Sequence, residues 1–141
     1  NPEECPFCLA LEESTREDSF VLDVGEKSFV MLNRYPYTSG HIMVLPLDHQ
    51  EDLSELDSET RMEMMDLIHH ACQVLTAVYQ PEGYNIGLNL GTAAGAGLPK
   101  HLHWHVVPRW KGDTNFMTTV GGVRVIPEAL KDTYAKVKSH W

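Results

Sequence analysis

The stretch His101-Leu102-His103-Trp104-His105-Val106-Val107 decides how this chain folds and what it can do. Side chains alternate across a β-strand, so a strand here places three histidines on one face and apolar residues on the other. Imidazole titrates near neutrality, so such a row can supply a nucleophile, a proton donor and an anion contact, or bind a metal. A solvated strand face with three polar residues is the remaining interpretation, but threonine, lysine or glutamate would serve there equally well.

The segments around this stretch predict the rest of a sheet. Strands are expected at 19–24, 28–32, 41–45, 84–90 and 101–107, from their β-rich composition and the turn residues between them. Pro108 is expected to close the last strand. Strands in hairpin order with helices set apart indicate a single α+β domain over residues 1–141, built around an antiparallel sheet.

Two helices are expected besides a short N-terminal helical turn. The longer one begins after a cap at Asp57 or Ser58 and ends at Tyr79. Its apolar residues recur at spacings of three or four: Met62, Met65, Ile68, Cys72, Leu75 and Val78. An amphipathic C-terminal helix is expected over 127–139, with Pro127 in its first turn.

Composition limits the partners and the compartment. The 141 residues include 43% hydrophobic and 22% charged residues, as in soluble globular proteins. A net charge of −9 disfavours nucleic acid and anionic membranes as partners, while a local cluster at Lys100, Arg109 and Lys111 could still accept a small polyphosphate. No apolar run approaches the roughly 20 residues of a membrane span. Three cysteines, an odd number, favour a reducing compartment, with the cytoplasm as the default.

Cys5 and Cys8 form a Cys-x-x-Cys pair in a loop that leads into the first helical turn. The pair is compatible with a redox dithiol, a structural zinc site or two unrelated thiols. The βαβ unit that usually carries a redox motif is missing, and structural zinc needs two further ligands. Cys72 lies within the long helix and is expected in the core.

The histidine stretch matches the signature His-φ-His-φ-His-φ-φ, with φ apolar, and therefore resembles the histidine-triad (HIT) family. Residues 33–46 are similar to the family's Asn-Arg…Pro…Gly-His…Pro segment, and residues 49–56 to the stretch that follows it. The resemblance covers 5–109, and residues 108–116 with Gly121-Gly122 look like the branch containing bacterial dinucleoside-tetraphosphate phosphorylases and hydrolases. It implies a HIT-like five-stranded antiparallel sheet with one long and one C-terminal helix.

The resemblance implies a reaction in two steps. His103 would attack the α-phosphorus of a dinucleoside polyphosphate and form a nucleotidyl-histidine intermediate, which water or phosphate then resolves. The other ring nitrogen of His103 should donate to a backbone carbonyl, expected on the strand 84–90. His105 would contact the α-phosphate or the bridging oxygen and assist the leaving group. His41 is expected to close a supporting hydrogen bond.

The resemblance also implies contacts to the nucleotide. Asn33 would reach the ribose, although it also fits a turn residue, and Asn89 would reach phosphate or ribose. The small residues of 91–97, including Gly95 and Gly97, would let backbone amides approach the phosphates, or would simply form a turn. Trp110 could stack on a second base, line the leaving-group side or pack in a dimer.

Two further positions concern the base and the leaving group. Phe7 and Met31 match positions that line the base pocket in relatives, and both also fit an ordinary core. Many relatives carry Gln followed by Ser or Thr just before the first triad histidine, where this chain has Gly97 and Leu98. A contact to the phosphates or leaving group is therefore lost or supplied by another residue.

In zinc-bearing relatives, the ligands that complete the site are a histidine past the third strand and the first triad histidine. The matching residues here are His49 and His101, which would complete a structural Cys₂His₂ zinc site with Cys5 and Cys8. His101 would then anchor His103 rather than react. No organic cofactor is expected, and the family's habit suggests a homodimer.

Three classes of function stay open at this point. The first is an enzyme that cleaves dinucleoside polyphosphates or, alternatively, adenosine phosphoramidates. The second is a nucleotide-binding protein with little turnover, and the third is a metal-binding module that uses the histidine row as ligands. Retention of all three histidines favours the enzyme.

Overall fold

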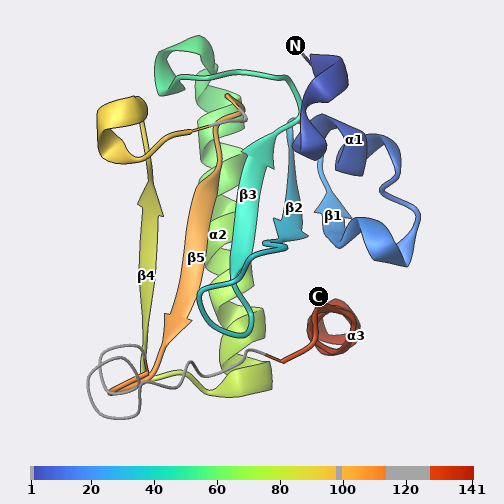
Figure 1. The fold of residues 1–141 in the computed structure, drawn as a ribbon, viewed down its shortest axis with the longest axis vertical. Helices are drawn as coiled ribbons and strands as arrows, with labels where there is room; N and C mark the ends of the chain where they lie inside the picture. Colours follow the sequence, from blue (N-terminus) through green and yellow to red (C-terminus); the bar gives the residue numbers. More distant parts are fainter. Residues whose placement is uncertain (1, 98–99, 114–127) are drawn as a thin grey trace.

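The computed structural model describes residues 2–97, 100–113 and 128–141. Within these residues, five strands form one sheet in the order β1-β2-β3-β5-β4, and every neighbouring pair is antiparallel (Figure 1). The strands are β1 (Val21–Val24), β2 (Ser28–Leu32), β3 (Ile42–Pro46), β4 (Gly83–Leu88) and β5 (Trp104–Arg109). The predicted α+β class and the antiparallel five-stranded sheet are confirmed.

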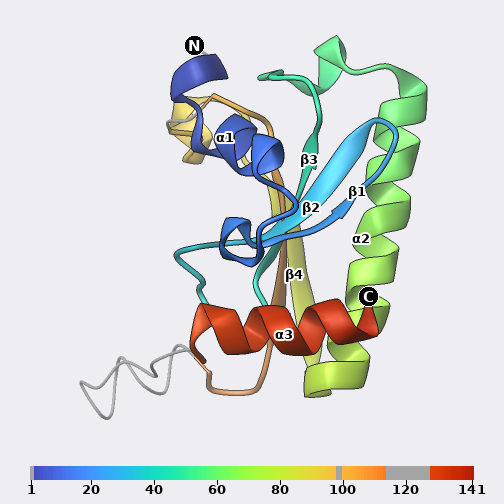
Figure 2. The same ribbon diagram turned by 90° about the vertical axis from the view of Figure 1, so that its right-hand side faces the viewer.

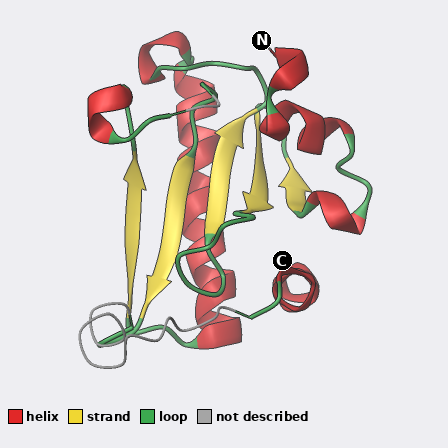
Figure 3. Ribbon diagram, in the orientation of Figure 1, coloured by secondary structure: helices red, strands yellow, loops and turns green. Residues whose placement is uncertain are grey.

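Helices cover both faces of the sheet. Helix α1 (Pro6–Glu12) and helix α2 (Ser58–Tyr79) lie on opposite sides of the sheet, and α3 (Leu130–His140) lies beside the lower part of the sheet with its C-terminal end at α2 (Figures 2 and 3). One apolar cluster packs α2 against the sheet through residues such as Val30, Val44 and Val106. A second, smaller cluster packs α1 against β1, β2 and β3. On the sheet face opposite α2, the strands β4 and β5 therefore lie outside the apolar cluster that packs against α1.

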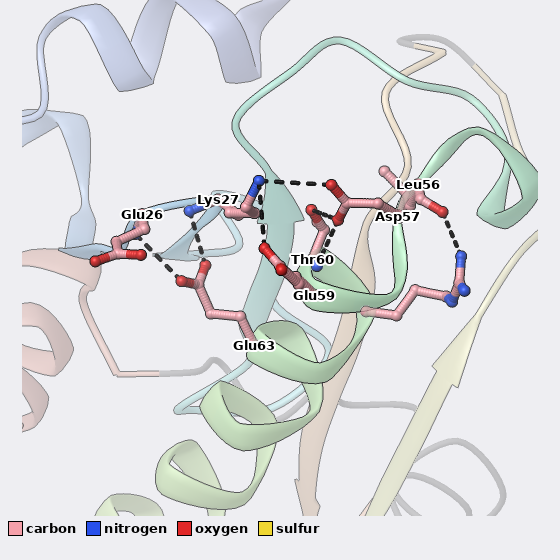
Figure 4. A network of polar contacts seen from close by, with 8 residues as sticks. Glu26, Lys27, Leu56, Asp57, Glu59, Thr60 and Glu63 are labelled. Atoms are coloured by element: carbon pink, nitrogen blue, oxygen red, sulfur yellow. Dashed lines mark hydrogen bonds and ion pairs between the residues drawn. The ribbon is translucent and has the colours of Figure 1, made fainter.

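Helix α2 begins where the sequence predicts, and its first turns also hold the β1–β2 hairpin. The Asp57 carboxylate accepts from the Thr60 backbone N–H at 2.8 Å, which caps the helix. One turn later, the Glu63 carboxylate accepts from the backbone N–H groups of Glu26 and Lys27 at 3.2 and 3.0 Å (Figure 4). Charge-assisted bonds of this kind join the helix to the turn between the two strands.

The predicted apolar face of α2 is only partly right. Met62 and Met65 are 67% and 53% exposed, whereas the neighbouring Met64 is buried. The side chains that meet the sheet are those of Met64, Ile68, Ala71, Val74 and Leu75. The spacing of three and four therefore holds, but the stripe is rotated, because the three methionines and two alanines of this helix allow more than one apolar stripe.

Several element boundaries differ from those predicted. The triad strand was expected at 101–107, but β5 begins at Trp104 and continues through Pro108 to Arg109. Helix α1 begins at Pro6, so Cys5 is its N-cap and Cys8 lies within it rather than in a loop. Proline is suited to this first helical position because its missing N–H would have no partner there.

The C-terminal helix is present but shifted. Helix α3 begins at Leu130, and Pro127, like Phe116 and Gly121-Gly122, lies outside the described residues. Lys138 Nζ donates to the Leu22 carbonyl at 2.6 Å, which ties α3 to β1. In the described part of the chain, α2 and the other helices are too short or too polar to cross a membrane.

Candidate active site and metal centre

The triad histidines lie on the sheet face opposite α2. Leu102 and Val106 are buried in the cluster beneath α2, so the alternating histidines point the other way, as predicted. The residues before β5 are held outside the strand ladder, because the Leu102 backbone N–H donates to the Gln50 carbonyl at 2.7 Å. This bond explains why the ladder begins only at Trp104.

His103 has one ring nitrogen fixed by the backbone. Its Nδ1 lies 2.8 Å from the carbonyl oxygen of His101, and a carbonyl only accepts, so Nδ1 carries the proton. The prediction of a backbone acceptor was correct, but its expected position on 84–90 was wrong. The neutral ring therefore keeps its lone pair on Nε2, the arrangement that a nitrogen nucleophile needs. The Phe7 ring packs against the imidazole, with ring centroids 5.1 Å apart.

A second histidine, His41, sets the tautomer of His105. The Tyr37 backbone N–H donates to His41 Nδ1 at 3.2 Å, so the proton of the neutral His41 ring lies on Nε2. That nitrogen is 2.8 Å from His105 Nδ1, which must accept. The proton of His105 therefore lies on Nε2, and the supporting role predicted for His41 is confirmed.

The imidazole rings of His41 and His105 are both neutral near pH 7. Burial, reinforced by the neighbouring imidazoles of His105 and His103, lowers the pKa of His41 to about 3. Burial and the neighbouring His103 lower the pKa of His105 to about 4. The site therefore places a neutral hydrogen-bond donor, His105, beside a potential nucleophile, with the two ring centroids 4.9 Å apart.

A pocket of about 460 Å³ opens beside His105. Its described lining comes from β4, β5 and the loop before β3: Tyr37, Thr38, Asn85, Ile86, Gly87, Asn89, His105, Val107 and Arg109. Pockets of this size hold nucleotide-sized ligands. Of the residues predicted to contact the nucleotide, Asn89 is the one in the described lining of this pocket.

The other predicted contact residues are absent from the described lining of this pocket. Asn33 Oδ1 accepts from the Tyr35 backbone N–H at 2.8 Å, and its Nδ2 lies 3.4 Å from His41 Nε2. The Gly95 N–H is already bonded to the Thr92 carbonyl at 3.1 Å. In the described part of the chain, the Gly97 N–H has no such backbone partner and stays available to a phosphate.

Trp110 is half-buried just after β5 and is absent from the described pocket lining. Its backbone N–H donates to Asp113 Oδ2 at 3.1 Å. Of the two candidates for the base pocket, Met31 is buried in the smaller apolar cluster and Phe7 packs at its edge beside His103. Phe7 is therefore the better placed of the two for contact with a ligand at His103.

The four predicted metal ligands meet at one point. The ligand atoms of Cys5, Cys8, His49 and His101 all lie within 4.8 Å of one another. Three sulfur–nitrogen pairs, Cys5–His101, Cys8–His49 and Cys8–His101, are each 3.5 Å apart. Tetrahedral zinc with ordinary bond lengths puts a thiolate and an imidazole about 3.5 Å apart, so the donor set fits zinc.

The outer contacts of this cluster also suit a metal. His101 Nε2 donates to the Pro46 carbonyl at 2.9 Å, which leaves Nδ1 as the free ligand atom. Cys5 and His101 are buried, while Cys8 and His49 are half-buried. A closed four-ligand set of this kind is typical of structural rather than catalytic zinc.

Sequence reasoning missed part of the pocket. Tyr37 and Thr38 were assigned only to a turn-rich loop, and Asn85 and Gly87 only to a strand. Strand alternation counted back from Asn89 would have placed Asn85 and Gly87 on the same face. Tyr37 carried no comparable signal, because its place depends on how the loop folds over His41 and His105.

Comparisons with known proteins agree with this geometry. A family model described as the HIT domain matches residues 14–112. An AP-4-A phosphorylase from Mycobacterium tuberculosis is 44% identical over 136 residues, covering 96% of this chain and 69% of that protein. An asymmetrical bis(5'-nucleosyl)-tetraphosphatase from Schizosaccharomyces pombe is 30% identical over 86 residues, covering 61% of this chain and 47% of that protein.

The fold of a zinc-bound histidine triad family protein from Mycobacterium smegmatis is similar, with a TM-score of 0.77 and 25% identity. The similarity covers 99% of this chain and 94% of that one. Matched residues of the family model include all three triad histidines, and the sheet and long helix follow the same architecture. This chain therefore belongs to the HIT family.

Proposed function

We propose that this protein cleaves dinucleoside polyphosphates at the α-phosphate, through a nucleotidyl intermediate on His103. It is an enzyme of the HIT family, a nucleotide hydrolase or nucleotidyltransferase. One observation carries the proposal: His103 Nδ1 lies 2.8 Å from the His101 carbonyl, so Nε2 is the ring nitrogen that can act as the nucleophile. The similarity to an AP-4-A phosphorylase supports a substrate like diadenosine tetraphosphate.

In the first step, the lone pair of His103 Nε2 forms a bond to the α-phosphorus. The bond from that phosphorus to the bridging oxygen breaks, and the departing polyphosphate keeps the electron pair. His105 Nε2–H donates a hydrogen bond to the oxygen on which negative charge develops, and the Gly97 N–H would add a second donor. Because a polyphosphate is a good leaving group, a hydrogen bond suffices and no proton needs to be transferred.

In the second step, an oxygen of water or phosphate attacks the same phosphorus. The bond to His103 Nε2 breaks, and the ring regains its lone pair; when water attacks, the proton it loses passes to the solvent. Water would give a nucleoside monophosphate, and phosphate would give a nucleoside diphosphate. The family relatives include both a phosphorylase and a tetraphosphatase, and the name of the first of them favours phosphate.

Mass spectrometry of the protein quenched during turnover tests the nucleophile. With diadenosine tetraphosphate, the parent should carry an added adenylyl group on the peptide containing His103, and His103→Ala should lose at least about a thousandfold in rate. Product analysis with and without phosphate distinguishes ADP from AMP. An unlabelled parent, or a label on another residue, would refute the proposal.

We further propose that Cys5, Cys8, His49 and His101 hold a structural zinc ion. Zinc supplies no step of the reaction there, because all four ligand positions belong to the protein. It would fix the backbone of His101, whose carbonyl in turn holds His103. The site would thereby stiffen the nucleophile without touching the substrate.

Metal analysis of purified protein tests the zinc proposal. The parent should contain about one zinc per chain, and Cys8→Ser should lose it and melt at least about 5 °C lower. Cys72→Ser removes a thiol from α2 that is remote from the cluster, so its zinc content should match the parent. Equal zinc in the two variants would contradict the proposed ligands.

A homodimer, expected from the family, would explain the exposed methionines Met62 and Met65 on α2. Both side chains lie outside the apolar cluster that packs this helix on the sheet. Light scattering of the purified protein measures the mass directly, and a monomer would remove this expectation.

A further inference from the structure

The pocket beside His105 is built from two neighbouring strands and one loop. Asn85 and Gly87 of β4, followed by Asn89, alternate in step with His105, Val107 and Arg109 of β5. The register pairs Gly87 with His105 and Asn85 with Val107, so these residues form a continuous floor. Tyr37 and Thr38 stand beside this floor, and Thr38 is fixed there because its Oγ1 donates to the Pro108 carbonyl at 2.8 Å.

The polar groups of the pocket suit an anion. Asn85 Oδ1 accepts a hydrogen bond from Arg109 at 2.5 Å. The NH₂ group of the same side-chain amide is left to donate to a ligand. In the part of the chain that the structure describes, neither that NH₂ nor the Asn89 amide has a hydrogen-bond partner. Arg109 is the charged residue of the described lining, and its guanidinium is paired with both carboxylate oxygens of Asp113 at 2.7 Å, so the donors offered to a ligand are the amide NH₂ groups. In a chain of net charge −9, a lining that offers amide donors beside a neutralised ion pair repels a phosphate less than the acidic surfaces do.

The loop side of the pocket presents an aromatic ring. Tyr37 is 64% exposed, and its ring stacks over His105 with centroids 6.1 Å apart and planes 20° apart. One ring face is therefore occupied by the imidazole, and the exposed remainder is open to a planar ligand. Aromatic rings favour stacked or edge-on partners, and a nucleobase is such a partner.

We propose that this pocket binds the leaving nucleotide, that is, the nucleoside polyphosphate that departs when His103 attacks. The inference rests on the proposed function. The leaving oxygen must lie opposite the attacking nitrogen across the phosphorus atom, and the pocket is lined by His105 but not by His103. The retained nucleotide stays with His103, while the leaving polyphosphate contacts Asn89 and Asn85 and its base stacks on Tyr37.

Gly87 makes the pocket testable. It lies directly opposite His105, and a Cβ added to it would meet nothing within 4 Å. A valine at this position would fill part of the pocket without straining the strand, since β-branched residues suit strands. Gly83 is a matched control, because it lies on the same strand, is equally open to a Cβ, and is absent from the described pocket lining.

Calorimetric titration with ATP, the leaving nucleotide of diadenosine tetraphosphate, measures occupancy of the pocket. Saturating AMP is added first, so that the site for the retained nucleotide is already filled. Gly87→Val should weaken ATP binding at least about tenfold, and Gly83→Val should leave it within about twofold. Circular dichroism melting of both variants verifies that the comparison is between folded proteins. Equal ATP affinities in the two variants, or no ATP binding by the AMP-saturated parent, would overturn the proposal.

A second pair of variants tests the stacking. Tyr37→Ala should weaken ATP binding about fivefold to tenfold in the same titration, whereas Tyr35→Ala should not. Tyr35 is in the same loop and is 85% exposed, but is absent from the described lining. These titrations need no turnover. Failure of the pocket therefore appears in ATP binding, and failure of the proposed reaction appears as an unlabelled His103.

Discussion

Backbone groups decide which ring nitrogen of each site histidine carries its proton. The His101 carbonyl can only accept, which puts the His103 proton on Nδ1. The Tyr37 amide can only donate, which puts the His41 proton on Nε2 and, through it, the His105 proton on Nε2. The nucleophilic nitrogen of His103 and the N–H donor of His105 are thus oriented side by side before any substrate arrives, which is the preorganisation that catalysis needs.

His41→Asn tests this chain of hydrogen bonds. Without the His41 ring, His105 Nδ1 loses its donor, and the Nε2–H tautomer is no longer enforced. We expect kcat for diadenosine tetraphosphate to fall about 10- to 100-fold, with KM within about twofold. Imidazole nitrogen NMR shifts should show His105 changing tautomer. His69→Asn, on the exposed surface of α2, is the control, and an unchanged His105 tautomer and kcat in His41→Asn would contradict the assignment.

At this scale, side-chain roles were easier to predict than their partners. The triad row and the supporting role of His41 followed from residue type and family resemblance. The acceptor for His103 was wrongly placed on 84–90. Every residue has a backbone carbonyl, so the sequence does not show which of them lies next to the ring. Tyr37 was missed for the same reason, since its backbone N–H and its ring matter only after the loop has folded.

Periodicity predicts that an element exists, while hydrogen bonds to other elements decide where it ends. The strand at 28–32 and the helix from Ser58 to Tyr79 agree with the structure, because a local hairpin and a local cap define them. The triad strand does not, because the Leu102 N–H bonds to the Gln50 carbonyl instead of joining the ladder. That contact joins residues about fifty positions apart, which no local pattern can reveal.

Glu63→Ala tests how α2 is joined to the β1–β2 hairpin. The substitution leaves the backbone N–H groups of Glu26 and Lys27 and the hydroxyl of Ser28 without their common acceptor. We expect the free energy of unfolding to fall by about 1.5 to 3 kcal/mol in urea titrations.

Glu59→Ala is the matched control for this prediction, because it removes a glutamate from the same helix. The Glu59 side chain is 80% exposed, and its carboxylate lies 3.9 Å from Lys27 Nζ, so the change should stay within about 0.5 kcal/mol. A Glu63→Ala protein as stable as Glu59→Ala would mean that the hairpin holds its turn without help from the helix.

The whole molecule brings together residues that the sequence keeps apart. Cys5 and His101 are 96 positions apart, yet their ligand atoms are 3.5 Å from each other. Helix α1, the loop after β3 and the segment before β5 each contribute to this cluster. Composition and spacing left the Cys-x-x-Cys pair undecided, and the resemblance to zinc-bearing relatives predicted the other two ligands. Only the packing of α1 on the sheet makes the four residues neighbours.

The same packing makes the folded protein sensitive to acid. His41 and His105 have pKa values of about 3 and about 4 in the folded state, lowered chiefly by burial, against about 6.5 when unfolded. As the pH falls below about 6.5, His41 and His105 therefore bind protons in the unfolded chain but stay neutral in the folded one. The stability from these neutral rings is fully present above pH 6.5 and is lost as the pH falls toward 4.

Each such histidine contributes a slope of about 1.4 kcal/mol per pH unit in this window. Urea unfolding at pH 7, 6, 5 and 4.5 should therefore show a steep loss for the parent, and His41→Asn should show a shallower one. Both proteins keep the four proposed zinc ligands, so acid release of metal affects them alike and the difference in slope isolates the buried ring. Parallel stability curves for the two proteins would mean that His41 takes up a proton in the folded state, and the acceptor role assigned to its Nδ1 would have to be abandoned.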